Sequence, residues 1–493
     1  MGYKDLAKDA VIIGITQVMV NLGNFLLLPF ITNGLSTNDY GLWTQVLVII
    51  SLLSSVAMLG QVMTILRFMR AKDDKRSIST EYFTVVGMVT LGSACLSLPL
   101  CILSVPLANI LLDNGSYAAL LAMAAMIIPL EALVGMNYAY FRAMGKIRTF
   151  AALSIFHAFG EISLILVFVL GGLGVFGAVL GSLVIGILAF SIGFALVVHQ
   201  VGITRPSWKM ARRNMKFGLP LAPNNIIRWV IQSSDRILVN LILGLTMAGI
   251  YSAAYNIGGV MFLIVAPIQM ILYPTLAKLY DEGNIDEVKE YMRRSFRYYM
   301  MLAMPAVVGL SILASPIMIA MTNPNYAIGA IVIPLVAIAG LANGMFKFVE
   351  NVTHLVKKTH LNLITFGFPA LTDVVLVLVL TPHMGIAGAA LATTISYIEM
   401  LIIGVLISRK FLRFSVEWNF VLKSAAASLA MIALILLINP SNIMGIALAI
   451  AVSIPAYFAM LYVLRGFTRV EVDIVKEYIH RALAWKKEKR LEH

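Results

Sequence analysis

The sequence predicts an all-α, polytopic membrane protein with 14 transmembrane helices, arranged as two parallel six-helix lobes plus two extra helices. Three observations lead to this prediction. Of the 493 residues, 60% are hydrophobic and only 12% are charged, whereas soluble domains are about half apolar and a quarter charged. The basic residues gather in alternate connections between apolar runs. The runs themselves carry a weak internal repeat.

Apolar runs separated by polar breaks predict where the membrane-spanning helices lie. Residues 11–31 and 443–464 are each long enough to cross a hydrocarbon core about 30 Å thick. The first run is too long for the apolar part of a cleavable signal peptide, so we expect it to form the first span. In chain order the expected spans cover residues 11–31, 43–65, 82–105, 118–140, 149–170, 175–198, 217–243, 248–273, 297–320, 327–348, 361–381, 385–407, 419–438 and 443–464.

The distribution of Lys and Arg predicts the orientation of these spans. Basic loops stay on the cytoplasmic side of a membrane, so both termini are expected in the cytoplasm of a prokaryote, with the chain multi-pass in its cytoplasmic (inner) membrane. The connections without any Lys or Arg lie around Asn38, Asn114, Gly172, Leu245, Asn323, Pro382 and Pro440. The alternate connections contain Arg67, Arg70, Lys72, Lys75, Arg76, Arg142, Lys146, Arg148, Arg205, Lys209, Arg212, Arg213, Lys216, Lys278, Lys289, Arg293, Arg294, Lys357, Lys358, Arg409, Lys410 and Arg413.

The remaining composition argues against several classes of protein. The formal net charge of +13 follows from the basic connections and indicates contact with anionic membrane lipid, not with nucleic acid. The two cysteines, Cys95 and Cys101, share one apolar run, and no metal-ligand spacing accompanies them. Residues 465–490 are basic and amphipathic, so we expect a cytoplasmic tail that lies on the membrane surface or presents a solvated face.

An internal repeat relates the first six spans to the next six. Gly41-Leu42-Trp43 opens the second span and Gly249-Ile250-Tyr251 opens the eighth, 208 residues later (249 − 41). The motifs that begin at Gly174 and Gly385 open the sixth and twelfth spans, 211 residues apart (385 − 174). Both pairs keep the same side of the membrane, which indicates parallel lobes with a cavity between them. The expected units are 1–200, 217–408, 419–464 and the tail 465–490.

The seventh expected span carries a polar stripe. Four residues of this span fall on one helical face: Asn225, Arg228, Gln232 and Asp235. Arg236 lies beside them. The repeat places a matching stripe on the first span, formed by Gln17, Asn21 and Asn24. We therefore expect the two stripes to line the cleft between the lobes.

Arg228 lies near the middle of its span, where a charge costs about 2.5–3.5 kcal/mol on insertion scales. Its guanidinium could form a bidentate pair of hydrogen bonds with the oxygens of a phosphate group. Alternatively, it could form a structural pair with Asp235 or Glu161. For Asp235 and Arg236 a functional and a structural role are equally open.

Two acidic residues occupy equivalent places in the repeat. Glu161 and Asp373 precede the Gly174 and Gly385 motifs by 13 and 12 residues (174 − 161 and 385 − 373). Each is expected either to bind a proton or cation or to form a buried pair. His157 is one helical turn before Glu161, close enough to relay a proton to it or to pair with it. At the inner end of the tenth span, Lys347 and Glu350 are expected to form a solvated helix end, in preference to a cytoplasmic gate.

Several motifs resemble a known group of transporters. Gly218-Leu219-Pro220, Ser234-Asp235-Arg236 and residues 249–255 resemble the central signature of polysaccharide-exporting flippases of the multidrug/oligosaccharidyl-lipid/polysaccharide superfamily. Asp39-Tyr40-Gly41-Leu42-Trp43 resembles the first outer loop of that family. The resemblance extends from residue 1 to about residue 464.

The resemblance implies a function and a set of roles. It implies an alternating-access flippase for an oligosaccharide on polyprenyl or dolichyl (pyro)phosphate, not an enzyme, with no cofactor beyond an Na⁺ or H⁺ coupling ion. Membrane lipid and glycan-assembly proteins are the implied partners, and the last two helices would hold the isoprenoid tail. The two polar stripes predict the substrate residues Arg228, Asn225, Gln232, Arg236, Gln17, Asn21 and Asn24, and the resemblance implies that the anion site depends mainly on Arg228 and Arg236. The resemblance implies a sodium site on Asp235, Asp373 and Thr394, and Glu161 joins them as an ion-coupling residue from its place in the repeat.

Two other functions stay open at this point. A drug–cation antiporter of the same superfamily is the nearer one, although Arg228 and fourteen spans count against it. A membrane enzyme that acts on lipid-linked sugars is the other. Such an enzyme would be expected to carry a large outer loop, whereas the longest expected outer connection has only about a dozen residues.

The topology makes a direct prediction. In a chain whose Cys95 and Cys101 are replaced, Asn114→Cys and Asn323→Cys should each react with a membrane-impermeant maleimide added outside intact cells. The reason is that both positions lie in connections without basic residues. The matched control, Arg148→Cys, should react only after the membrane is opened. Labelling of either asparagine position from the cytoplasmic side alone would contradict the orientation.

Overall fold

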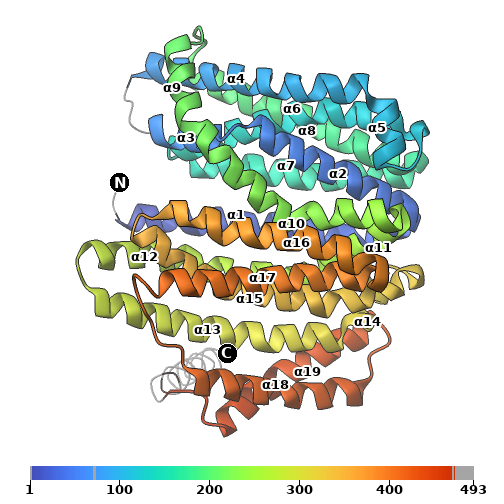
Figure 1. Ribbon diagram of the computed structural model, residues 1–493, viewed down its shortest axis with the longest axis vertical. Helices are drawn as coiled ribbons and strands as arrows, with labels where there is room; N and C mark the ends of the chain where they lie inside the picture. Colours follow the sequence, from blue (N-terminus) through green and yellow to red (C-terminus); the bar gives the residue numbers. More distant parts are fainter. Residues whose placement is uncertain (1–2, 70–73, 469–470, 472, 474–493) are drawn as a thin grey trace, which may run out of the picture.

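The computed structural model describes residues 3–69 and 74–468, together with Glu471 and Asp473. These residues form 19 α-helices with short 3₁₀ or π turns between some of them, and no strand (Figure 1). The first ten helices are α1 (Tyr3–Gly34), α2 (Thr37–Ala57), α3 (Gln61–Phe68), α4 (Lys75–Ile102), α5 (Ser104–Leu111), α6 (Ala118–Ala143), α7 (Ile147–Phe168), α8 (Gly174–Val201), α9 (Trp208–Gly218) and α10 (Ala222–Leu243). The others are α11 (Leu245–Gly258), α12 (Ala266–Asp281), α13 (Ile285–Ile312), α14 (Ala314–Met321), α15 (Val332–Leu355), α16 (Asn362–Met384), α17 (Ile386–Ser408), α18 (Trp418–Ile438) and α19 (Ile443–Val463).

Local sequence signals set several helix boundaries. The Ser36 hydroxyl accepts a hydrogen bond from the Asp39 main-chain N–H at 3.1 Å, which satisfies one of the free donors at the start of α2. Asp74 caps α4 in the same way through the N–H of Ser77, at 2.9 Å. Gly244 has a φ of +82°, a value that glycine adopts without a steric cost, and it separates α10 from α11.

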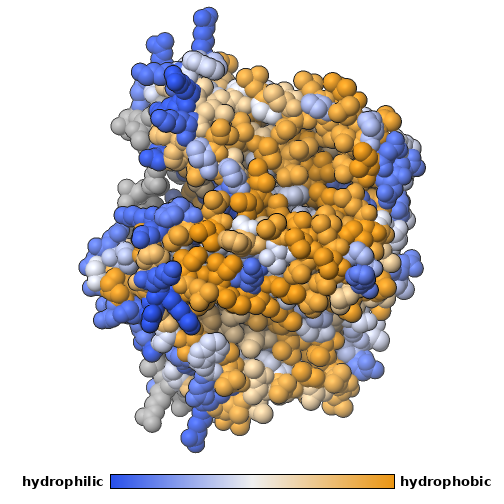
Figure 2. Space-filling model, viewed as in Figure 1, coloured by the Kyte–Doolittle hydropathy of each residue, from blue (hydrophilic) through white to orange (hydrophobic). Residues whose placement is uncertain are grey.

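The predicted class of fold is confirmed, because the described chain is helical and spans a membrane many times. Twelve segments of the described residues are long and apolar enough to cross a bilayer. An apolar band occupies the middle of the surface in Figure 2, between two hydrophilic edges. The ends of α3, α9 and α12 lie at the left edge of Figure 1, and α5, α11 and α14 lie at the right. The basic connections therefore gather at one edge, which we call the basic edge.

The count of fourteen spans stays a prediction. One apolar segment, Ile147–Val201, contains two of the expected spans, α7 and α8, which meet at Gly172 with a φ of +87°. The expected seventh span corresponds to α10. It is not among the twelve segments, since it carries three charged residues, Arg228, Asp235 and Arg236.

Three large apolar cores show how the halves are joined. One core lies within the first half, between Ala57 and Val197, and another lies within the second half, between Met261 and Leu461. The third runs from Leu27 to Ala392 and contains residues of both halves. The division into units 1–200, 217–408 and 419–464 stays a prediction. Arg70, Lys72 and most of the expected tail 465–490 lie outside the described residues.

The two halves are in contact at the edge opposite the basic one, through α2 and α11. A Cβ atom on Gly41 would collide with the carbonyl oxygen of Leu245, and one on Gly249 would collide with the main chain of Thr37 and Gly41. Only glycine permits so close an approach of two helix backbones. The glycines that begin the two repeat-related motifs therefore pack against each other.

Polar contacts between the halves occur near the same edge. The side-chain amide of Asn240, on α10, donates to the carbonyl oxygen of Leu111 at 2.7 Å. The amide of Asn323 donates to the carbonyl oxygen of Thr32 at 3.0 Å. Together with the glycine contact, these bonds close this edge of the molecule.

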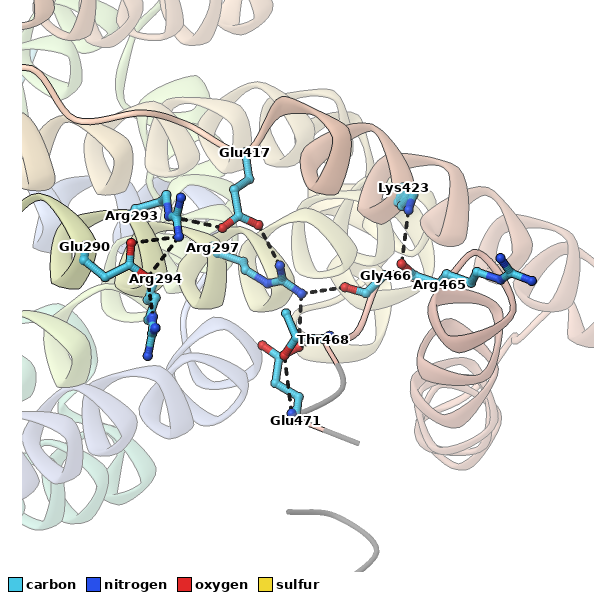
Figure 3. Close-up of polar contacts among 10 residues, drawn as sticks. All are labelled: Glu290, Arg293, Arg294, Arg297, Glu417, Lys423, Arg465, Gly466, Thr468 and Glu471. Atoms are coloured by element: carbon cyan, nitrogen blue, oxygen red, sulfur yellow. Dashed lines mark hydrogen bonds and ion pairs between the residues drawn. The ribbon is translucent and has the colours of Figure 1, made fainter. Parts of the chain in front are cut away.

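At the basic edge, a buried arginine fastens α18 and α19 to α13 (Figure 3). Arg297 donates to Glu417 at 2.6 Å, to the carbonyl oxygen of Gly466 at 2.6 Å and to Glu471 at 3.0 Å. Its guanidinium also lies 4.3 Å from the ring centroid of Phe420. Only 10% of the Arg297 side chain is exposed, so its charge depends on these partners.

This arrangement predicts unequal effects for two neighbouring arginines. Arg297→Ala should destabilise the protein by about 3–5 kcal/mol, because it leaves the carboxylates of Glu417 and Glu471 without their shared cation. Arg294→Ala is the matched control. Arg294 is 67% exposed and pairs with Glu290 one turn away, so its loss should cost less than about 1 kcal/mol. Thermal unfolding of both variants in detergent tests this order, and equal melting temperatures would contradict it.

Candidate functional site

A cavity of about 550 Å³ lies between the two halves of the molecule. Its walls come from α1, α2 and α7 of the first half and from α10, α11 and the turn after α11 in the second. We call it the central cavity. Its polar lining consists of Asn21, Asn24, Tyr40, Trp43, Thr44, Ser51, Glu161, Ser233, Arg236, Ser252, Tyr255 and Asn256.

The predicted stripe on the first span lies partly in this cavity. Asn21 and Asn24 line it, whereas Gln17 is exposed and is not part of the lining. The repeat had placed all three in the cleft. The amide of Asn256 donates to the Tyr40 hydroxyl across the halves at 3.4 Å. Tyr40 belongs to the Asp39–Trp43 motif, but nothing in the sequence pattern predicted its place in the cavity or that of Asn256.

The α10 helix presents a different face to the cavity from the predicted one. Ser233 and Arg236 line the central cavity, and the indole N–H of Trp229 donates to Ser51 of α2 at 2.9 Å. These three residues follow one another at helical spacing and form the inward face. Asn225, Arg228 and Gln232 are not part of the cavity lining.

Arg236 brings a permanent positive charge to the central cavity. Its guanidinium lies 4.7 Å from the ring centroid of Tyr255, a cation–π contact. Its buried Nε atom has no hydrogen-bond partner within the described part of the chain. An unpaired guanidinium donor in a polar cavity is suited to an anionic ligand.

Arg228 is paired, but with a residue that the sequence analysis did not propose. Its guanidinium donates to Glu350 of α15 at 2.6 Å and lies 3.9 Å from the ring centroid of Phe366. The proposed pairing with Asp235 or Glu161 is therefore wrong. Helix periodicity identified the face on which Arg228 lies but not the helix that packs against it.

Glu350 is the centre of a charged cluster, so the expectation of a wet helix end is also wrong. Its side chain is only 6% exposed, and three basic groups surround it. Lys347 contacts it at 2.7 Å, His354 at 3.7 Å and Arg228 at 2.6 Å. Two permanent cations on one buried carboxylate leave an excess of positive charge near the basic end of α10.

Asp235 and Asp373 are both fully buried in the second half. Asp235 accepts hydrogen bonds from the Tyr251 hydroxyl at 2.5 Å and from the Thr393 hydroxyl at 3.4 Å. Neither carboxylate oxygen of Asp373 has a hydrogen bond of good geometry in the described structure, although the hydroxyls of Ser396, Thr393 and Ser234 lie near it. A buried carboxylate with such weak hydrogen bonding is costly as an anion, so it is suited to a proton or a cation.

Thr394 does not contribute to this pair of acids as expected. Its hydroxyl donates to the carbonyl oxygens of Leu335 and Ala390, at 2.9 and 2.8 Å. The neighbouring Thr393 supplies the hydroxyl instead. A shift of one residue turns a side chain by about 100° around a helix axis, and sequence matching alone did not resolve it.

Glu161 faces the central cavity, and its hydrogen-bond partner is Ser182 of α8 at 2.7 Å. His157 is not paired with Glu161 as proposed, since its Nε2 atom lies 3.4 Å from Glu131 of α6. Among the described residues, no group of three or more His, Cys, Asp or Glu side chains is placed to hold a metal ion.

The chain matches known proteins in sequence. Residues 34–326, more than half of the chain, match a family model described as polysaccharide biosynthesis protein. A probable flippase of Haloferax volcanii, AglR, is 26% identical over 233 residues, which are 45% of this chain and 46% of that protein. A probable low-salt glycan biosynthesis flippase of the same organism, Agl15, is 19% identical over 220 residues, with the same coverage. The chain therefore matches slightly less than half the length of these curated relatives.

Solved structures share the fold over nearly the whole chain. The lipid II flippase MurJ, in an inward closed conformation, matches with a TM-score of 0.77 at 14% identity, over 91% of this chain and 97% of that one. An inward-facing multidrug resistance MATE family transporter of the MOP superfamily matches with a TM-score of 0.64 at 15% identity, over 80% and 97%. At these identities the likeness establishes the fold.

Proposed function

The chain belongs to the polysaccharide biosynthesis protein family, and from this premise we propose that it is a flippase for a lipid-linked oligosaccharide. The cargo that we propose is an oligosaccharide on polyprenyl or dolichyl (pyro)phosphate, which crosses the cytoplasmic membrane by alternating access. Proteins of this kind are membrane transporters and not enzymes. The family match and the two probable flippases of Haloferax volcanii support the class of cargo.

The observation that carries the proposal is the central cavity and its closed edge. The cavity takes its walls from both halves, and Gly41 and Gly249 seal the molecule at the edge without basic residues. If that edge is the outer one, the molecule has the form of a transporter whose site is shut from outside. Opening would require the halves to separate at the glycine contact, as alternating access demands.

Arg236 is the residue that we propose as the main contact for the phosphate groups. It carries the cavity's permanent positive charge and keeps a free donor atom. Asn21 and Asn24 lie in the same cavity and offer amide donors to phosphate or sugar oxygens. Arg228 would act as a second cation near the basic edge, with Asn225, Gln232 and Gln17 on exposed helix faces around it.

The proposal disfavours a drug–cation antiporter, which shares this fold. A cationic drug would enter a cavity in which Arg236 already places a positive charge. Bringing like charges together in a partly dry space is costly, whereas an anionic head group would be attracted. The fold alone does not separate the two functions, and the charge of Arg236 supports an anionic cargo.

Ion coupling is a second part of the proposal. Asp235 and Asp373 would bind an Na⁺ or H⁺ in the second half, with the hydroxyl of Thr393 beside them. No other cofactor is proposed. We further propose that the protein lies in the cytoplasmic membrane of a prokaryote with both termini inside, where it would receive its cargo from glycan-assembly proteins.

The role of Arg236 can be tested with purified protein in liposomes. Arg236→Ala should bind a polyprenyl-pyrophosphate-linked oligosaccharide about 10- to 100-fold more weakly, because a charge-assisted hydrogen bond contributes about 1.5–3 kcal/mol. Arg236→Lys should keep part of the affinity, since the charge remains but the planar fork is lost. Arg212→Ala, an exposed position on α9, is the matched control and should bind like wild type. Wild-type binding and flipping by Arg236→Ala would show that this charge does not serve the cargo.

The same assay extends to Arg228. Arg228→Ala should reduce flipping, and Arg228→Lys should restore part of it, provided that Arg228 contacts the cargo. Glu350→Gln separates this role from a structural one. It would leave Arg228 free, so cargo affinity should rise if Glu350 competes with phosphate for the guanidinium, whereas a purely structural pair would give only a loss of melting temperature.

Coupling at the buried acids is tested with ion gradients. Asp373→Asn keeps the size of the side chain but removes its charge, so flipping should no longer respond to an imposed Na⁺ or pH gradient while the protein still folds. Glu399→Gln, on α17 and outside both acidic sites, is the control. A full gradient response by Asp373→Asn would assign this residue a structural role.

A further inference from the structure

A second cavity, of about 430 Å³, lies within the first half and meets the central cavity at one acidic residue. We call it the lateral cavity. The two cavities share three lining residues, Leu47, Ser51 and Glu161. Of these, Glu161 is the one that carries an ionisable group. Glu161 therefore lies at the junction of the two cavities.

Two more ionisable groups line the lateral cavity beside Glu161. His157 lies one helical turn away on α7, and its Nε2 atom is 3.4 Å from the carboxylate of Glu131 on α6. The Nδ1 atom of His157 is 3.2 Å from the Tyr138 hydroxyl. The Nδ1 contact is a hydrogen bond, whereas Nε2 lies near Glu131 without hydrogen-bond geometry. An imidazole placed between two such groups can gain a proton on one nitrogen and release it from the other.

The charge of this cluster depends mainly on its own members, because the helices around it contribute few charged side chains. From α6 it is faced by Glu131 and Tyr138, and from α8 by the Ser182 hydroxyl on Glu161. The α1 helix packs on α7 but carries no charged residue between positions 11 and 34, and α2 offers only serine hydroxyls to the lateral cavity. Across the central cavity stands Arg236 of α10.

The chemistry of the cluster favours a proton over a metal ion. Na⁺ and divalent cations bind to several oxygen ligands at once. Here the oxygens belong to two acids on different helices with an imidazole between them, and no metal-holding group occurs among the described residues. Imidazole and carboxylate are instead the two side chains whose charge most readily changes near neutral and acidic pH.

We propose that Glu131, His157 and Glu161 form a proton-binding site of the first half, in which Glu161 exchanges protons with the His157–Glu131 pair and presents them to the central cavity. This site is separate from Asp235 and Asp373. Its use in driving cargo rests on the proposed flippase function, but the binding of a proton does not.

The position of the site suggests how it senses the arrangement of the halves. Ser51, at the junction of the two cavities, accepts the hydrogen bond from Trp229 of the second half. When the halves rock against each other, this bond has to break, and the junction beside Glu161 changes shape. Proton access to Glu161 would thereby follow the conformational cycle.

Infrared difference spectroscopy tests proton binding without any cargo. Purified wild-type protein in nanodiscs, taken from alkaline to acidic pH, should show a protonated-carboxyl C=O band that Glu161→Gln removes. His157→Gln should change the pH at which that band appears, because the partner of Glu161 in proton exchange is gone. Glu287→Gln, at an exposed position on α13, is the control and should leave the band and its titration unchanged. A Glu161→Gln spectrum identical to that of wild type, or an unchanged titration in His157→Gln, would overturn the site.

Liposome flipping under an imposed pH gradient then tests coupling. Wild type should flip its cargo faster with the gradient in sodium-free buffer, and His157→Gln and Glu131→Gln should each lose that acceleration. A folded variant is recognised by a melting temperature close to that of wild type. A gradient response retained by both variants would overturn the role in coupling. Absence of flipping by wild type under every gradient would contradict the flippase function itself, and the infrared result would still decide the proton site.

Discussion

The backbone contact between α2 and α11 at Gly41 and Gly249 is the constraint on which the arrangement of the halves depends. Each glycine lies where any side chain would strike the main chain of the other helix. The contact brings the halves together at one edge and leaves the central cavity behind it. Because the two glycines begin repeat-related motifs, one pseudo-symmetric interaction both closes the edge and sets the shape of the site.

Charged side chains within the helices fall into two groups according to their partners. Glu81 is held by Arg213 and Asn214, Arg297 by two carboxylates, and Glu350 by three basic groups. Paired in this way, a buried charge contributes to the fold. Arg297 also keeps one nitrogen without a partner, but its other nitrogens bind carboxylates, whereas Arg236 and Asp373 have unpartnered atoms and no ion pair within the described structure. Since an unpaired buried charge is costly, these are the places where a ligand or an ion would restore the balance.

The sequence predicted the helical membrane fold and named Asn21, Asn24, Glu161 and Arg236, which line the central cavity, but it failed where the partners of side chains had to be predicted. Composition and loop charge are local properties, so they were sufficient for the fold class. In α10 the pattern 225, 228, 232, 235 was a true helix face, but the cavity is lined by the adjacent face of Ser233 and Arg236. The choice between the faces, like that between Thr393 and Thr394, depends on which helices pack on α10 and α17. The periodicity of a sequence shows which residues share a helix face, but it does not show which other helix packs against that face.

The proposed proton site and the proposed anion site are linked through the cavity that they share. Glu161 and Arg236 line the same space, so a proton on Glu161 removes a negative charge from the cavity that an anionic head group would enter. Protonation should then strengthen binding of the anion, and bound anion should strengthen binding of the proton by the same factor, because coupling between two equilibrium sites is reciprocal. In the proposed alternating-access cycle, the glycine edge opens while the proton and the anion are bound. It closes again after both have been released. Coupling of this sign carries the proton and the anion in the same direction, so a proton gradient would drive the cargo toward the side of lower proton concentration.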